Sequence, residues 1–105
     1  MFSIIDRKKR LELHLAMKVR GADEGGHSFD EDTQTRNLSA GGLCFESRHH
    51  VPVGCRVSLE IAIPGAMRKH FGGQAVYAVN AVVCRVERFE DGDVSRVGAR
   101  FIGHS

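Results

Sequence analysis

Hydrophobic and polar positions alternate with period two along much of the chain. Apolar side chains occupy every second position across residues 11–19, and again across residues 55–63, with polar or small residues between them. Strict alternation is typical of a β-strand that buries one face and exposes the other. Both segments are therefore predicted to be strands that contribute one face to a core.

Four other segments have strand character, because they are rich in apolar or β-branched residues and are bounded by turn residues. The longest of them is too long for one straight strand, and Asn80-Ala81 at its middle indicates a bend or bulge. Asp91-Gly92 is predicted to form the hairpin turn that precedes the last strand. The four predicted strands are residues 33–38, 43–47, 74–89 and 94–102.

Two connections lack the strand pattern. Residues 23–32 hold five acidic residues and no Lys or Arg, with Phe29 as their one large apolar residue, so a mobile loop is predicted. Residues 66–71 are predicted to be a short polar connection that can form one helical turn.

These elements predict an all-β fold, a small antiparallel barrel of six or seven strands joined mostly by short turns. A length of 105 residues allows one domain. Residues 1–10 are expected to be a flexible N-terminal arm with a basic cluster, and residues 11–105 the barrel domain.

Composition narrows the function classes. The net charge of +2 and seven aromatic residues, none of them Trp, argue against a nucleic-acid surface, so neither DNA nor RNA is expected as a partner. No run of 18 apolar residues and no secretory segment are present, which predicts a cytoplasmic protein without membrane insertion. The odd number of cysteines, three, predicts reduced thiols.

Two polar segments stand out as candidate sites. The first is the basic run from Arg7 to Arg10, which on composition alone is a solvated arm. The second runs from Asn37 to Gly42, where Asn and Ser side chains in a hairpin turn commonly bond their own backbone. Each segment alone therefore fits a purely structural role.

Taken together, the two segments resemble a known family. The pattern Asn37-x-Ser39-x-x-Gly42, the strand start at residues 54–57 and the closing run at residues 97–101 resemble the PilZ domain family. The resemblance implies a six-stranded antiparallel barrel in a bacterial second-messenger pathway, with cyclic di-GMP as the ligand.

The resemblance also implies the binding residues. The family carries an R-x-x-x-R motif before its first strand; Arg10 matches the second arginine, while Asp6 stands at the first and Arg7 lies one position later. Arginine offers a planar fork for phosphate or for guanine O6 and N7, and glycine permits close approach of the backbone. The expected ligand-binding residues are Arg7, Arg10, Asn37, Ser39, Gly41 and Gly42, with Lys9 and Arg36 as further contacts.

The expected function is a cyclic di-GMP receptor that signals to a downstream protein partner and is not an enzyme. An adaptor that contacts proteins without binding the nucleotide is the alternative, and Asp6 is the residue that favours it. No cofactor or metal is expected, because no histidine stands at a familiar ligand spacing. Arg85, Arg96 and Arg100 are expected on the outer face of the barrel rather than in a site.

Overall fold

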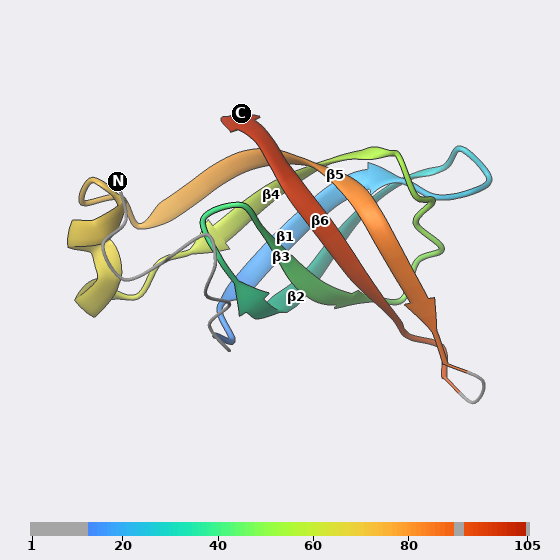
Figure 1. The fold of residues 1–105 in the computed structure, drawn as a ribbon, viewed down its shortest axis with the longest axis horizontal. Coiled ribbons are helices and arrows are strands. Elements are labelled where there is room, and N and C mark those ends of the chain that lie inside the picture. Colours follow the sequence, from blue (N-terminus) through green and yellow to red (C-terminus); the bar gives the residue numbers. More distant parts are fainter. Residues whose placement is uncertain (1–12, 90–91, 105) are drawn as a thin grey trace.

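Six antiparallel strands close into a barrel in this computed structural model, which describes residues 13–89 and 92–104 (Figure 1). The order around the barrel is β1-β2-β3-β6-β5-β4, and every neighbouring pair is antiparallel. The predicted fold class is confirmed. The strands are β1 Ala16–Ala22, β2 Ser28–Leu38, β3 Gly42–Ser47, β4 Arg56–Ala62, β5 Val76–Arg88 and β6 Ser95–His104, with the 3-10 helix η1 at Gly65–Phe71.

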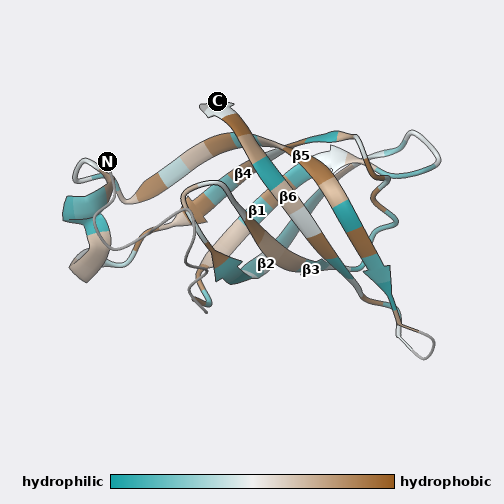
Figure 2. Ribbon diagram, in the orientation of Figure 1, coloured by the Kyte–Doolittle hydropathy of each residue, from teal (hydrophilic) through white to brown (hydrophobic). Residues whose placement is uncertain are grey.

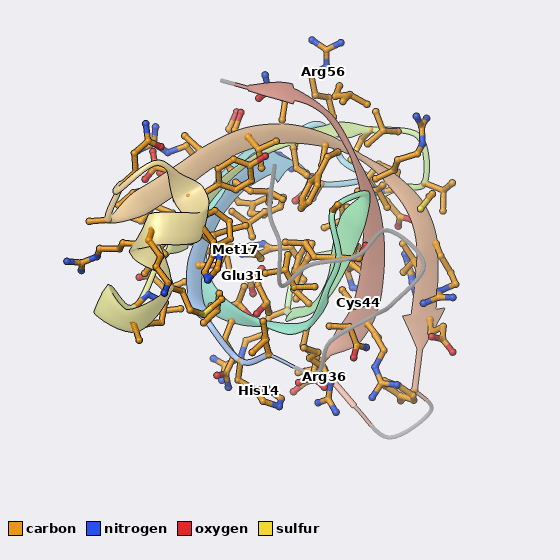
Figure 3. All side chains as sticks on the ribbon, turned by 60° about the vertical axis from the view of Figure 1, so that its left-hand side comes forward. His14, Met17, Glu31, Arg36, Cys44 and Arg56 are labelled. Atoms are coloured by element: carbon orange, nitrogen blue, oxygen red, sulfur yellow. The ribbon has the colours of Figure 1, made fainter. Side chains whose placement is uncertain are left out.

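The alternating residues of the strands fill the barrel interior. Val19, Phe45, Leu59 and Val97 have no exposed surface, and hydrophobic and hydrophilic segments alternate along the strands in Figure 2. A barrel of only six strands is narrow enough for its own side chains to pack the interior completely (Figure 3). A ligand must therefore bind on the outside of this barrel or at its ends.

The long segment predicted at residues 74–89 forms a single strand, β5, whose pairing with β6 has two irregularities. The ladder to β6 shifts register between Asn80 and Ala81, at the position where the sequence predicted a bend. A second shift lies between Val83 and Arg85, which leaves Cys84 as the extra residue. Bulges of this kind bend a strand and redirect its side chains. The second bulge changes how Arg85 is presented on the outer surface.

The prediction of a loop at residues 23–32 is wrong beyond residue 27. Strand β2 begins at Ser28, and its residues 28–34 pair with the whole of β1. The segment has no apolar stripe, and ladder hydrogen bonds and opposite charges stabilise it. Asp30 stands opposite Arg20, and Asp32 stands opposite Lys18. The Arg20 Nε to Asp30 Oδ1 distance is 3.0 Å.

The turn between β1 and β2 is itself ordered by Asp23. Its carboxylate accepts hydrogen bonds from the backbone N–H groups of Gly25 and His27, both at 2.9 Å. The backbone hydrogen bond from His27 is the main cause that lowers the pKa of Asp23. The neighbouring Glu24 then contacts Arg88 of β5, with 2.7 Å between Oε2 and Nη2. This end of the barrel is therefore cross-linked by polar contacts.

The other end of the barrel is covered by η1, which extends the single turn predicted there. Its last residue, Phe71, is buried and packs at a tilt against Tyr77, with 5.6 Å between ring centroids. Burial raises the pKa of the Tyr77 hydroxyl. Within residues 13–89 and 92–104, no helix has the length and apolar character to cross a membrane.

The chain enters the barrel beside β2. The buried Thr35 hydroxyl accepts a hydrogen bond from the Leu15 N–H at 2.9 Å and donates one to the Leu13 carbonyl at 2.5 Å. Thr35 is two residues before Asn37 on the same strand. The first described residues are thereby fixed next to the strand that carries the Asn-Ser-Gly motif.

Candidate functional site

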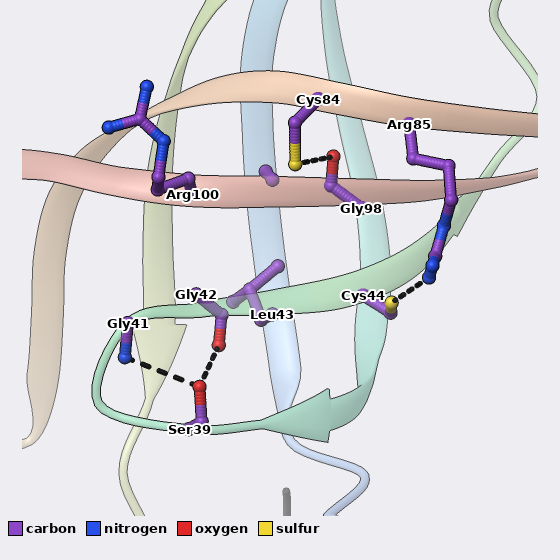
Figure 4. A pocket seen from close by; sticks show the side chains of 10 residues that line it. Ser39, Gly41, Gly42, Leu43, Cys44, Cys84, Arg85, Gly98 and Arg100 are labelled. Atoms are coloured by element: carbon purple, nitrogen blue, oxygen red, sulfur yellow. Dashed lines mark hydrogen bonds between the residues drawn. The ribbon is translucent and has the colours of Figure 1, made fainter. Parts of the chain in front are cut away.

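The turn between β2 and β3 is held by Ser39. Its backbone N–H donates to the Gly42 carbonyl at 2.9 Å. Its hydroxyl accepts from the Gly41 N–H at 3.2 Å and lies 3.3 Å from the Gly42 carbonyl, to which it donates (Figure 4). The serine therefore shapes the turn through hydrogen bonds to the turn's own backbone, as its place in a hairpin turn predicted. It also lines a hollow next to the turn.

Gly42 is required by the packing of β3 against β6. It stands opposite Arg100 in the ladder, and a Cβ at this position would overlap the carbonyl oxygen of Ala99. The φ angle of Gly42 is not positive, so the need for glycine comes from the close approach of the neighbouring backbone. The motif glycine thus has a structural role in closing the barrel.

One row of residues crosses four strands on the outer face. Asn37 of β2 pairs with Cys44 of β3, Cys44 pairs with Gly98 of β6, and Gly98 pairs with Arg85 of β5. Adjacent strands lie about 4.8 Å apart, so the row extends roughly 14 Å between its outermost Cα atoms. The Asn37 amide makes no hydrogen bond within the described part of the chain.

A groove of about 200 Å³ lies over this row, which we call the motif groove. Arg85 crosses above Gly98 and donates from Nη2 to the Cys44 sulfur at 3.5 Å, while Arg100 stands at the opposite end of the groove (Figure 4). The lining residues are Ser39, Gly41, Gly42, Leu43, Cys44, Cys84, Arg85, Gly98, Ala99 and Arg100.

Charge distinguishes the motif groove from larger hollows on the same barrel. Among the described residues, its lining contains two arginines and no carboxylate. A hollow of about 480 Å³ contains Arg48, but Glu46 and the acidic residues 30–32 also line it, and these four carboxylates would repel an anion. In a third hollow of about 530 Å³, Arg36 is paired with Glu46 at 2.8 Å. The motif groove is therefore the better suited of the three to a phosphate-bearing ligand.

The residues predicted for the site fall into three groups. Ser39, Gly41 and Gly42 line the motif groove, and Asn37 lies in the row beneath it. Arg36 lines the separate hollow that contains Glu46. Arg7, Lys9 and Arg10, together with Asp6, lie outside the residues that the structure describes.

Two arginines of the groove were not predicted as site residues. Arg85 and Arg100 are on the outer face, as predicted, yet both line the motif groove. Arg100 follows Gly98 by two positions, so the period of a strand already places them on one face. The position of Arg85 depends on the second bulge, which no pattern in the sequence predicts.

The cysteines and the other metal-ligating side chains of the described residues form no metal site. Cys44, Cys55 and Cys84 form no disulfide with one another, and burial raises the pKa of the Cys55 thiol. Among the described residues, no cluster of His, Cys, Asp or Glu has an arrangement that would hold a metal ion.

Known proteins share this architecture. The profile of the PilZ domain family matches residues 6–105. The structure of the Bacillus subtilis inhibitor of motility, MotI/DgrA, superimposes with a TM-score of 0.66 at 18% identity, covering 96% of this chain and 44% of that one. MrkH of K. pneumonia in its apo state gives a TM-score of 0.62 at 12% identity, covering 95% and 44%.

A second MrkH structure, described as a c-di-GMP-dependent transcription regulatory factor, gives a TM-score of 0.53 at 13% identity, covering 91% of this chain and 43% of that one. This chain thus spans less than half the length of the solved proteins that it matches. No curated protein sequence is significantly similar to it.

Proposed function

The chain belongs to the PilZ domain family, and we propose that it is a cyclic di-GMP receptor in bacterial second-messenger signalling. The observation that carries the proposal is the motif groove: Ser39, Gly41 and Gly42 border a hollow whose described lining contains two arginines and no carboxylate. MrkH, which shares the fold and is described as a c-di-GMP-dependent transcription regulatory factor, supports the same function.

The chemistry of the ligand suits the groove. Cyclic di-GMP presents two phosphates and two guanines. The Asn37 amide, which makes no hydrogen bond within residues 13–89 and 92–104, offers a donor and an acceptor to a guanine edge. The Gly41–Gly42 backbone lets a ring approach closely. We propose that Arg7 and Arg10, assisted by Lys9, supply the phosphate contacts from the N-terminal segment.

The way the chain enters the barrel supports a contribution from that segment. The hydrogen bonds of Thr35 hold Leu13 and Leu15 against β2, two residues from Asn37. Arg10 precedes Leu13 by three residues, a length of chain that extends about 10 Å at most. The arginine is therefore within reach of the motif strand.

The output of such a receptor is a change in a protein contact rather than catalysis. We propose a downstream protein partner in the cytoplasm, whose affinity for this domain changes when cyclic di-GMP binds. The relatives differ in output, since one is named for motility and the other for transcription. The fold alone therefore does not select the process that this chain controls.

Calorimetric titration with cyclic di-GMP tests the proposal. We expect binding by the natural sequence, and Arg10→Ala should weaken it about tenfold or more, because a charge-assisted hydrogen bond is lost. Arg20→Ala is the matched control, since Arg20 is an exposed arginine on β1 whose partner is Asp30. Equal affinity in the Arg10 and Arg20 variants would remove Arg10 from the site.

An adaptor that does not bind the nucleotide is the second candidate, and Asp6 favours it by replacing the first arginine of the family motif. No heat and no change in backbone chemical shifts at millimolar cyclic di-GMP would select this function. Binding with shifts centred on the motif groove would exclude it.

A further inference from the structure

We infer that Arg85, Gly98 and Arg100 form the second half of the ligand site, in which one guanine lies over Gly98 between the two arginines. This inference rests on the proposed function, because it takes cyclic di-GMP as the ligand. It adds β5 and β6 to a site that the motif alone places on β3 and on the end of β2. Neither arginine belongs to the R-x-x-x-R or Asn-Ser-Gly motif.

Gly98 provides a flat floor for a planar ring. It is a buried residue in the interior of β6, where glycine is unfavourable because it weakens a strand. Its φ angle is not positive, and a Cβ built there would make only ordinary contacts, at 3.6 Å from the nearest Arg85 atom. The backbone therefore does not require glycine at this position, and the missing side chain leaves the floor of the groove flat beneath Arg85.

Within the described part of the chain, Arg85 is held over this floor by weak contacts only. Its Nη2 donates to the Cys44 sulfur, which is a weak acceptor, and its Nε lies 3.8 Å from Glu87. The side chain is 53% exposed, so moving it aside or upward costs little. A guanine or a phosphate would offer stronger acceptors, in the paired geometry that a guanidinium fork matches.

Arg100 bounds the opposite side of the same floor. It stands directly across the ladder from Gly42, the last residue of the motif, and two residues from Gly98 on β6. Its side chain is exposed and makes no ion pair within residues 13–89 and 92–104. A ring seated over Gly98 therefore meets a guanidinium at each side, and both can stack on it or pair with its edge.

The size of the groove sets how much of the ligand it takes. About 200 Å³ is room for a single base, not for the whole cyclic dinucleotide. The second guanine and the phosphates would then extend toward Asn37, at the other end of the four-strand row. One guanine thus lies between Arg85 and Arg100, and the other lies near Asn37.

Calorimetry with cyclic di-GMP on Arg85→Ala, Arg100→Ala and Gly98→Ala tests the inference. Each arginine variant should raise Kd about tenfold or more. Gly98→Ala should also raise Kd several-fold, since a methyl group then stands on the floor of the groove. Arg20→Ala is the control for loss of an exposed arginine, and circular dichroism verifies that each variant retains the strand signal of the barrel.

Arg85→Lys distinguishes the contribution of the positive charge from that of the planar guanidinium group. Lysine retains the positive charge but lacks the planar fork, so its Kd should stay close to that of Arg85→Ala if pairing and stacking matter. Tight binding by the natural sequence together with unchanged Kd in both arginine variants overturns the inference and leaves the proposed function intact. Absence of binding by the natural sequence overturns both, and is recognised before any variant is measured.

Discussion

Replacing Gly42 with alanine should destabilise the barrel itself, apart from any effect on a ligand. A Cβ at this position overlaps the Ala99 carbonyl oxygen, which belongs to the backbone of β6. A side chain could rotate away from the new methyl group, but a backbone carbonyl in a hydrogen-bonded ladder cannot. The strain is therefore relieved only by separating β3 from β6, where Gly42 pairs with Arg100.

The expected magnitude follows from that geometry. Overpacking in a well-packed region costs typically 1–3 kcal/mol, and a backbone neighbour places Gly42→Ala near the top of that range, at about 3 kcal/mol. A domain of this size is stable by about 5–15 kcal/mol, so the loss is a large fraction of the total. With a slope of about 1.5 kcal/mol/M, the urea midpoint should fall by about 2 M.

Gly98→Ala is the matched control on the neighbouring strand. The added methyl group makes only ordinary contacts with Arg85, and the φ angle of Gly98 suits any residue. Alanine also reduces the conformational freedom of the unfolded chain, which contributes about 0.4–1 kcal/mol in favour of folding. We therefore expect the free energy of unfolding to stay within about 1 kcal/mol of the natural sequence, or to rise.

Urea unfolding followed by far-ultraviolet circular dichroism measures both variants, since the chain has no Trp to report by fluorescence. The slopes should match that of the natural sequence, so that the midpoints report stability alone. Equal midpoints for Gly42→Ala and Gly98→Ala would refute the reasoning. The motif glycine would then have to be explained by the ligand and not by the sheet.

Two further outcomes are expected. Asp6→Arg restores the family spacing with Arg10 and removes an acid near the phosphates, so calorimetry should give a lower Kd for cyclic di-GMP; a higher Kd would mean that the natural spacing is already the working one. Asp23→Ala should lower the urea midpoint at neutral pH. Because the folded state lowers the pKa of Asp23, its contribution is present above the ordinary value of 3.8 and is lost as the pH falls below it, so the two midpoints should converge in acid. A difference that persists unchanged in acid would contradict this.

The strand pattern predicted the fold well because one face of each strand is buried. Leu59 and Ile61 alternate with exposed or half-buried neighbours in β4, and the structure follows that period directly. The pattern failed at Ser28, where β2 begins, because Phe29 is the one apolar side chain of residues 28–34 that packs against the core. Ladder hydrogen bonds and cross-strand charge pairs stabilise this part of β2. The hydropathy pattern of a single sequence detects neither kind of interaction.

The residues of the candidate site that are close together in the sequence were predicted, and those that only strand pairing brings together were missed. Ser39 and Gly42 are three residues apart, so their shared turn could be predicted from local chemistry. Arg85 meets the same groove only through the pairing of β5 with β6 and of β6 with β3.

That pairing is also shifted by the bulge at Cys84, which decides which of two adjacent residues lies beside Gly98. A one-residue change of register would exchange the faces of every side chain beyond it. Without the bulge, Cys84 and not Arg85 would complete the row that begins at Asn37, and the groove would lose one of its two arginines. The charge of the motif groove is therefore a consequence of strand register as much as of composition.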